Sequence, residues 1–274
     1  MKIIVAILLL NTAIASQYDP GESDLEIVKS PKILEQVHSS KSNTLPYSLD
    51  HRALDQLIDI RGFGDSGWSW THESPPIQAE FGAALDRFSK DGKYYRGDLN
   101  FMNWESVIGD QCEQWHAPYR RGRSYAFLSR SENIEQAIRR QIEFFALSNN
   151  HTRDCHQVSS EIDWGQITTI NELTRIQNQF PELVYHGVDY SNKNSPKIVQ
   201  KKIKGREIKI AFSTLYTGRE SCPFATCLED IPEVLLKMKM ATADLKILMI
   251  HSMSDQSKLV EIARKFIKES DGDI

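Results

Sequence analysis

From about residue 54 onward, short apolar runs alternate with stretches whose apolar residues recur every three or four positions. The short runs predict strands, and the three-to-four spacing predicts helices. Strands are expected at Leu57–Phe63, Leu99–Met102, Ile142–Leu147, Lys197–Lys204, Glu207–Thr214 and Leu245–Ile250. Helices are expected at Ile77–Phe88, from Ser131 onward, and at Ile167–Ile176, Pro232–Met240 and Asp255–Lys268. This alternation predicts an α/β fold whose sheet is covered on both faces, with a turn at Gly205-Arg206 between two adjacent strands.

The first 15 residues predict a signal sequence. Met1-Lys2 is a short positive start, Ile3–Leu10 is an unbroken apolar run, and Ala13-Ile14-Ala15 supplies small residues where a signal peptidase cleaves. The apolar run is shorter than the roughly 20 residues that span a bilayer, and a buried first strand is the alternative interpretation. Residues 16–53 are polar and irregular, which predicts an extension of low order. We therefore expect an exported protein of the periplasm or cell envelope, without a transmembrane span after cleavage.

Export to an oxidising compartment would favour disulfides among the four cysteines. Four cysteines allow three pairings. Cys222 and Cys227 are close enough in the chain for a local clip, which would leave Cys112 with Cys155. A metal site is the alternative, but the spacing matches neither a zinc ribbon nor a zinc finger.

Net charge bears on the class of partner. The chain has a formal net charge of −4 and a pI near 6.1, which gives no electrostatic reason to expect nucleic-acid binding.

Polar residues follow four of the predicted strands, where an α/β fold places its ligand sites. Their side chains offer carboxylate oxygens, amide oxygens and imidazole nitrogens, and they are Asp65, Asn103, Glu105, Asn150, His151 and His251. Such a mixed set suits borderline divalent ions such as Mn²⁺, Zn²⁺ or Fe²⁺. Two ions about 3.5–4 Å apart could polarise a phosphoryl or acyl oxygen and activate water. Each residue alone would pass as a turn, a helix cap or a satisfied buried histidine.

The order of these motifs resembles a known family. Phe145–Asp154 resembles the "ANNH..D" signature of CapA-type capsule-synthesis proteins of the poly-γ-glutamate biosynthesis family. Asn103-Trp104-Glu105-Ser106 is similar to that family's "NLE(T/S)" motif, Gly64-Asp65 to its "GD" motif, and Ile250-His251 to its strand-end histidine. The resemblance implies a calcineurin-like metallophosphoesterase fold, an α/β/β/α sandwich, spanning residues 54–274. It implies candidate metal ligands for two divalent ions at Asp65, Asn103 or Glu105, Asn150 and His251, and candidate catalytic residues at His151 and Asp154.

The chain departs from the family pattern in two places. His251 is followed by Ser252-Met253 where the family has Trp-Gly. The family also closes its site with a later Gly-His-x-x-His segment, which would follow Gly272-Asp273-Ile274 at the end of this sequence. We therefore expect an incomplete C-terminal part of the fold, with reduced or absent activity.

Three functions remain open at this stage. The first is a metal-dependent hydrolase or transferase acting on an anionic envelope polymer, the second is a phosphoesterase for a small phosphorylated substrate, and the third is a non-catalytic polymer-binding protein. A basic cluster at Arg120, Arg121 and Arg123 is a candidate anion contact, with a solvated loop as the alternative. Trp68 and Trp70 are candidates for a substrate groove or for ordinary packing.

Overall fold

The structure is a computed structural model, and it describes residues 4–11, 58–66, 69–70, 81–89, 92–93, 95–110, 127–155, 164–252 and 256–269. Met1–Ala13 and Ile58–Ile274 form one compact unit, and Ile14–Leu57 form a second one. The second unit lies outside the described residues, and so does the predicted extension that falls within it.

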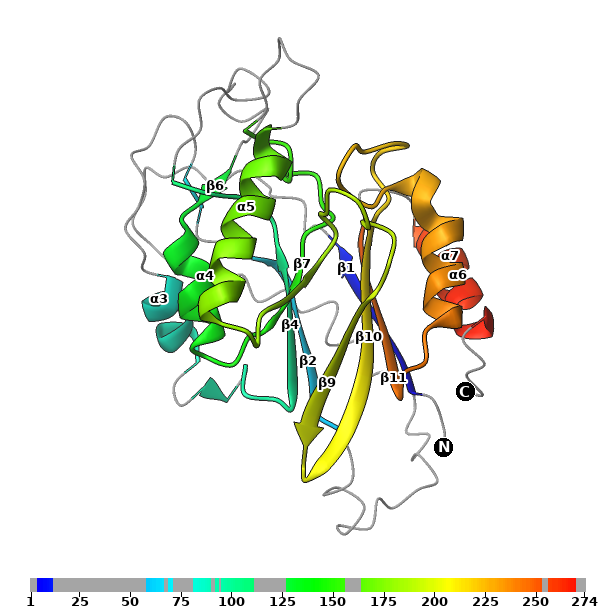
Figure 1. The fold of residues 1–274 in the computed structure, drawn as a ribbon, viewed down its shortest axis with the longest axis horizontal. Helices are drawn as coiled ribbons and strands as arrows, with labels where there is room; N and C mark the ends of the chain where they lie inside the picture. Colours follow the sequence, from blue (N-terminus) through cyan, green and yellow to red (C-terminus); the bar gives the residue numbers. More distant parts are fainter. Residues whose placement is uncertain are drawn as a thin grey trace, which may run out of the picture. The chain divides into compact units, whose positions relative to one another are not determined.

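Two four-stranded sheets form the centre of the first unit (Figure 1). The sheet that we call the β4 sheet contains, in spatial order, β2 (Ile60–Ser66), β4 (Leu99–Trp104), β7 (Phe144–Ala146) and β8 (Val184–His186), all parallel. The other sheet, which we call the β10 sheet, contains β1 (Ile4–Asn11), β11 (Leu245–Ser252), β10 (Arg206–Tyr216) and β9 (Lys197–Ile203). Only β9 runs antiparallel to its neighbour in that sheet. A small third sheet joins β3 (Ser69–Trp70), β6 (Leu128–Ser129) and β5 (Val107–Ile108).

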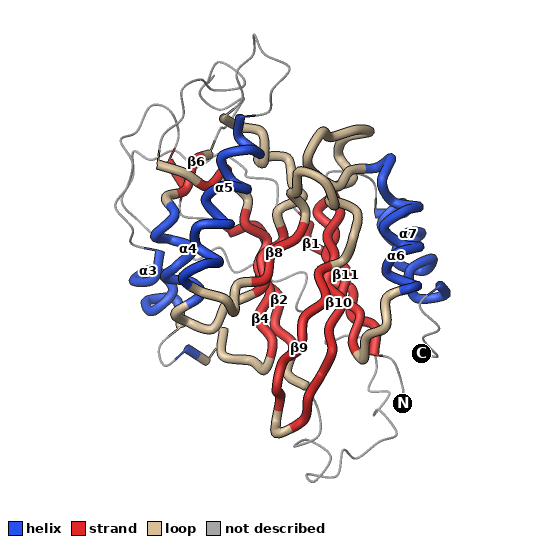
Figure 2. Tube along the Cα trace, in the orientation of Figure 1, coloured by secondary structure: helices blue, strands red, loops and turns tan. Residues whose placement is uncertain are grey.

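Helices lie on the two outer faces of this pair of sheets, as Figure 2 shows. The outer face of the β4 sheet packs against α3 (Phe81–Phe88), α4 (Ser131–Ile138) and α5 (Trp164–Gln179). The outer face of the β10 sheet packs against α6 (Ile231–Met240), which follows the short 3₁₀ helix η2 (Leu228–Asp230), and against α7 (Gln256–Glu269). The protein is therefore a mixed α/β fold, as predicted from the sequence, although the residues alone suggested one sheet where the structure has two.

A continuous apolar core fills the space between the two sheets. Every second residue of β4, β7, β10 and β11 points into it, including Phe101, Phe144, Phe212, Ile247 and Met249. The rings of Phe101 and Phe144 lie 4.4 Å apart, and that of Phe212 lies 5.4 Å from Phe101. Because burying one such side chain contributes about 1.5–3 kcal/mol, this layer fixes how the sheets face each other.

The tight turn between β9 and β10 lies one residue earlier than predicted. Lys204 and Gly205 both have positive φ, 48° and 80°, and they form the turn, while Arg206 already belongs to β10. Two successive residues with positive φ give a turn whose twist matches that of the paired strands, which is why a glycine stands here.

Several element boundaries differ from the sequence prediction. The strands β4 and β11 continue through Asn103 and His251, and α5 begins earlier and ends later than its apolar spacing indicated. The strand β8 was not predicted, because three residues are too few to show a periodicity.

Residues 4–11 form the edge strand β1, which runs parallel to β11. An unbroken apolar run suits both a signal sequence and a strand, and strand pairing in the uncleaved chain does not test cleavage. The signal sequence thus stays a prediction. None of the helices in the described ranges is both long and apolar enough to cross a membrane.

Candidate metal centre

Strand alternation brings Asn103 and His251 to the same place. Asn103 continues the set of β4 residues that face the core between the sheets, and His251 continues the corresponding set of β11. Each residue lies near the carboxyl end of its strand, and both are buried. The amide nitrogen of Asn103 lies 3.1 Å from Nδ1 of His251, although the two residues are 148 positions apart in the chain.

A β-bulge turns Asp65 toward the same point. In β2, Phe63 pairs with Met102, but the next paired residue is Asp65, opposite Asn103, so Gly64 is the extra residue. Residues that pair across a sheet share a face, and the bulge therefore puts Asp65 on the inner face, which regular alternation would have given to Gly64. The amide of Asn103 donates to Oδ1 of Asp65 at 2.7 Å.

Glu105 completes a group of three ionisable side chains. It follows β4 directly, and its backbone N–H donates to the carbonyl of Ser66 at 2.8 Å, which ties it to the end of β2. One ligand atom each from Asp65, Glu105 and His251 lies within 4.8 Å of the other two. The side chains are 23%, 13% and 1% exposed in that order, so the centre opens to solvent on the Asp65 side.

Proximity and burial shift the pKa values of Asp65 and Glu105 in opposite directions. Burial, reinforced by the charge of Asp65 and a hydrogen bond with it, raises the pKa of Glu105 to about 8. Burial also raises the pKa of Asp65, but the hydrogen bond and ion pair with His251 and the bond from Asn103 outweigh it, so the net shift is downward. The two pKa values are thus shifted in opposite directions, as expected when two carboxyl groups are held together and one of them also pairs with a histidine.

The donor set fits a divalent cation. Oδ1 of Asp65 lies 3.2 Å from Nδ1 of His251, close to the roughly 3.3–3.6 Å between two ligand atoms that are bonded to one tetrahedral Zn²⁺ ion at 2.0–2.2 Å. A cation would also offset the repulsion between the Asp65 and Glu105 carboxylates that raises the pKa of Glu105. Two carboxylates and an imidazole are ligands that borderline divalent ions accept.

Asn150 and Asn103 contact the histidine of this group from two sides. Nε2 of His251 lies 2.6 Å from Oδ1 of Asn150, and it donates the hydrogen bond. In the neutral ring this leaves the lone pair on Nδ1, the nitrogen that faces Asp65, whereas the ion pair with Asp65 requires the protonated ring. In the structure Asn103 presents its amide nitrogen to both partners, so it supports them and does not offer its oxygen to the centre.

His151 and Asp154 form a pair at the edge of the same centre. Nδ1 of His151 lies 2.5 Å from Oδ2 of Asp154, and Nε2 lies 3.8 Å from Oε1 of Glu105. The aromatic ring of Phe127 lies 4.4 Å from the imidazole, and the backbone N–H of Phe127 donates to Oδ2 of Asp154 at 2.6 Å. The carboxylate thus orients the imidazole, and Nε2 is directed to the carboxylates.

Asn149 has a role that sequence reasoning did not assign. Its side-chain nitrogen donates to the carbonyl of Trp104 at 2.8 Å and to Oδ1 of Asn103 at 3.3 Å. Its side-chain oxygen accepts a hydrogen bond from the backbone N–H of His151 at 3.1 Å. Asn149 therefore ties the end of β4 to the loop that carries Asn150 and His151. Its place within the quoted Asn-Asn-His motif was the only signal available.

A buried polar network lies just before this loop. Oγ of Ser148 contacts the carbonyl of Gly187 at 3.2 Å and Oγ1 of Thr214 at 3.0 Å, and it also contacts Thr226. Nδ1 of His186 accepts from the backbone N–H of Thr214 at 3.0 Å. Because Thr214 belongs to the β10 sheet and His186 to the β4 sheet, this network joins the two sheets beneath the loop.

The structure thus brings together seven of the predicted site residues, which are Asp65, Asn103, Glu105, Asn150, His151, Asp154 and His251. The predicted anion contacts Arg120, Arg121 and Arg123 lie outside the described residues, as does Trp68, and the side chain of Trp70 is not described.

The cysteines agree with the disulfide prediction as far as they are described. Cys222 and Cys227 form a disulfide with a Cα–Cα distance of 5.8 Å. Cys155 is disulfide-bonded as well, and its predicted partner, Cys112, lies outside the described residues.

No protein-family model matches this chain, and neither does any curated protein. The site therefore rests on its own geometry.

Proposed function

We propose that this protein is a metal-dependent hydrolase of the metallophosphoesterase type, related to the CapA-type capsule-synthesis proteins whose motifs it resembles. One observation carries the proposal. Asp65, Glu105 and His251 come from three separate strand ends and converge to within 4.8 Å, beside a histidine oriented by a carboxylate. Two carboxylates and two imidazoles at one partly open place are typical of a functional site, because such a cluster of ionisable groups is costly for folding alone.

Asp65, Glu105 and His251 are the residues that would hold a metal, with Asn150 next to them. A divalent ion, or a pair of ions, bound there supplies Lewis-acid polarisation of a phosphoryl oxygen and a more acidic water. The remaining chemistry belongs to the side chains of the chain itself.

His151 is the residue that moves a proton. Asp154 accepts the hydrogen bond from Nδ1–H, which leaves the Nε2 lone pair facing the centre in the neutral ring. Once protonated, Nε2 can donate to a leaving-group oxygen, and Asp154 stabilises the imidazolium. Phe127 covers one side of the imidazole and limits its rotation.

The substrate class follows from the resemblance. We propose an anionic polymer of the cell envelope, reached after export, and the arginine cluster at 120–123 would be a suitable contact for it. A small phosphorylated substrate is the alternative, and the assay below separates the two.

The test combines metal analysis with hydrolysis. The purified full chain is loaded with Mn²⁺ or Zn²⁺, its bound metal is quantified, and bis-p-nitrophenyl phosphate and a purified capsule polymer are offered as substrates. Asp65→Asn and His251→Ala should lose metal and turnover together. His151→Asn should keep the metal and lose about 10²–10⁴-fold in turnover.

Glu182→Gln is the matched control, because Glu182 precedes β8 at the opposite end of the sheet and should leave both measurements unchanged. A wild-type chain that binds no divalent ion would refute the proposal. Polymer binding by such a metal-free chain would instead support a non-catalytic envelope protein.

A further inference from the structure

A second polar cavity lies at the other end of the β4 sheet. It has a volume of about 430 Å³ and is lined by Asp86, Tyr95, Arg96, Arg139, Arg140 and Gln141. Arg96, Arg140 and Asp86 give the cavity a net charge of +1, since the guanidinium of Arg139 lies over the ring of Phe180, although the whole chain carries −4. The local charge is therefore opposite in sign to that of the protein.

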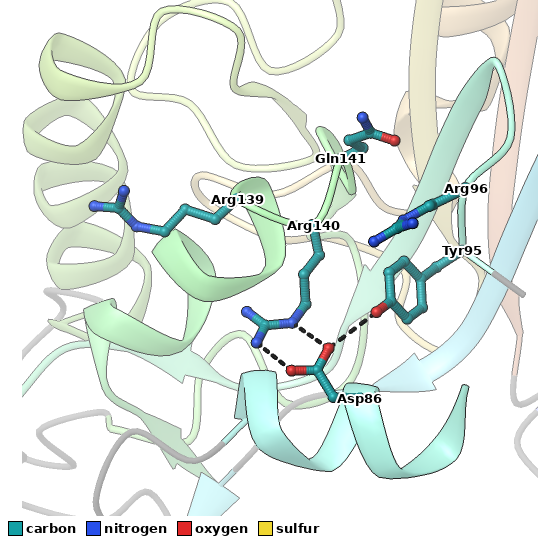
Figure 3. Close-up of a pocket in the computed structure, with 6 residues that line it drawn as sticks. All are labelled: Asp86, Tyr95, Arg96, Arg139, Arg140 and Gln141. Atoms are coloured by element: carbon teal, nitrogen blue, oxygen red, sulfur yellow. Dashed lines mark hydrogen bonds and ion pairs between the residues drawn. The ribbon is translucent and has the colours of Figure 1, made fainter. Parts of the chain in front are cut away.

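Part of the lining is held in a fixed arrangement, as Figure 3 shows. Asp86 on α3 accepts two hydrogen bonds from Arg140, at 2.9 and 2.6 Å, and one from the hydroxyl of Tyr95 at 3.0 Å. The bonds from Arg140 and Tyr95 lower the pKa of Asp86 to about 2, so the carboxylate stays charged. Arg140 also donates to the carbonyl of Gln136 at 3.0 Å, which fixes its guanidinium.

The guanidinium of Arg96 is held less firmly than that of Arg140. Figure 3 shows its guanidinium directed toward Arg140, and within the described part of the chain no group accepts a hydrogen bond from it. Arg139 extends away from the others and lies over the ring of Phe180, 4.8 Å from its centroid. Arg96 thus brings guanidinium donors that no residue in the described ranges accepts from, close to the pair formed by Arg140 and Asp86.

The lining has one more unusual feature. Gln141 has a φ of +67°, a conformation that favours glycine, and it lies in the turn between the end of α4 at Ile138 and the start of β7 at Phe144. Its backbone carbonyl accepts a hydrogen bond from Asn100 at 2.9 Å, which anchors it to β4. The backbone of Gln141 is therefore held rigidly, and its amide side chain adds a further hydrogen-bonding group to the cavity.

We propose that this cavity binds a phosphomonoester group, with Arg96 as its principal contact and Arg140 as a fixed second charge. A phosphomonoester carries about −1.5 to −2 charges at neutral pH and accepts several hydrogen bonds, which suits the positive charge of the cavity and the guanidinium donors that Arg96 brings to it. The volume falls in the range of small-molecule sites, so the phosphate can carry an organic group into the cavity.

This site is separate from the proposed metal centre. The cavity adjoins the residues before β4 and β7, whereas the metal centre lies at the carboxyl ends of the same parallel strands. At about 3.3 Å per residue, the length of β4 alone separates them by roughly 17 Å. Binding here does not depend on whether the metal centre is catalytic.

Calorimetry on the full chain tests the proposal, with EDTA present in an Asp65→Asn background to silence the metal centre. Inorganic phosphate and glycerol 1-phosphate are titrated separately. Binding of glycerol 1-phosphate supports the proposal, whereas binding of inorganic phosphate alone would overturn it, because the cavity would then hold only the free ion. Arg96→Gln should weaken the affinity about tenfold or more, the loss expected for a charge-assisted hydrogen bond.

The matched control is Arg87→Gln. Arg87 is exposed on α3 next to Asp86 but does not line the cavity, so its loss should change the affinity less than about twofold. Equal weakening by the two substitutions would overturn the proposal, because it would show unspecific attraction to a basic surface. Absence of binding by the parent chain at millimolar concentrations of both ligands would overturn it too.

Discussion

Replacing Asn149 with alanine removes three hydrogen bonds that join two parts of the candidate metal centre. The side-chain nitrogen now serves the carbonyl of Trp104 and Oδ1 of Asn103, and the side-chain oxygen serves the backbone N–H of His151. Asn149 is only 2% exposed, so water cannot reach these partners without a local rearrangement. The substitution therefore acts on folding and on the site together.

The expected size of the effect follows from the groups left without a partner. Each buried polar group that loses its hydrogen bond costs about 1–3 kcal/mol. The Trp104 carbonyl and Asn103 Oδ1 are both in buried residues, while His151 is half-buried. Two such groups predict a loss of roughly 2–6 kcal/mol in the free energy of unfolding. Without Asn149, the loop that carries Asn150 and His151 is no longer tied to the end of β4. The affinity for metal should therefore fall by about 10–100-fold, the range found when supporting contacts of metal ligands are removed.

Urea denaturation measures the first effect, and Mn²⁺ or Zn²⁺ titration of the folded variant at low denaturant measures the second. Asn192→Ala is the matched control, since Asn192 is an exposed asparagine in a loop and should change stability by less than about 0.5 kcal/mol. A stability loss below about 1 kcal/mol with unchanged metal affinity would refute the role assigned to Asn149.

Three further predictions concern the frame around the site. Burial, aided by the charge of Lys197, lowers the pKa of His186 to about 3, so between pH 6.5 and 3 the unfolded state binds a proton that the folded state does not. The free energy of unfolding should thus fall by about 1.4 kcal/mol per pH unit as the pH falls through this window. Urea denaturation at several pH values should show that the free energy of unfolding depends less steeply on pH in His186→Gln than in the wild type. Lys204→Asn should stabilise the protein by about 0.5–1 kcal/mol, because asparagine tolerates the positive φ of this turn better than lysine does. Thermal unfolding should therefore show a raised Tm. A lowered Tm would mean that the lost ion pair with Asp98 outweighs the gain in the turn. Replacing both Cys222 and Cys227 with serine opens a short loop, with a sequence separation of 5, and should cost about 2 kcal/mol in chemical denaturation, whereas no change would mean that neighbouring contacts hold the loop without the bond.

The strands and helices were largely predictable because burial on one or both faces leaves a periodic trace in the sequence. β4, β7 and β11 are buried along their whole length, and each was recognised as an apolar run. The meeting of Asp65 and Glu105 was predictable for a related reason, since neighbouring parallel strands bring their carboxyl ends to one edge, whereas His251 reaches them from the other sheet. These inferences need only the local pattern and one general rule of sheet geometry.

The face on which each residue lies was harder to predict. A sequence reading treats Asp65 as the end of a strand, whereas the structure places it inside β2, after a bulge at Gly64. A bulge adds one residue and reverses the alternation, and nothing in Phe63-Gly64-Asp65 distinguishes it from a regular strand or a turn. The division of the strands into two sheets was likewise available only from the family resemblance, because apolar periodicity reports that a strand is buried and does not report which strands it pairs with.

The network beneath the site shows why local patterns could not reveal how the centre is held. Ser148, His186, Thr214 and Thr226 come from four separate segments, and each would pass as an isolated polar residue. At Gly187, where φ is +113°, an added Cβ would lie 2.4 Å from the nitrogen of Ser148 and 2.5 Å from Oγ1 of Thr214, so only glycine allows these segments to approach. The residue after Ser148 is Asn149, which fixes His151 and the end of β4. The position of the loop with Asn150 and His151 therefore depends on the contact between the two sheets. A substitution at Gly187 should weaken binding of a divalent ion at the candidate metal centre without touching any of its candidate ligands.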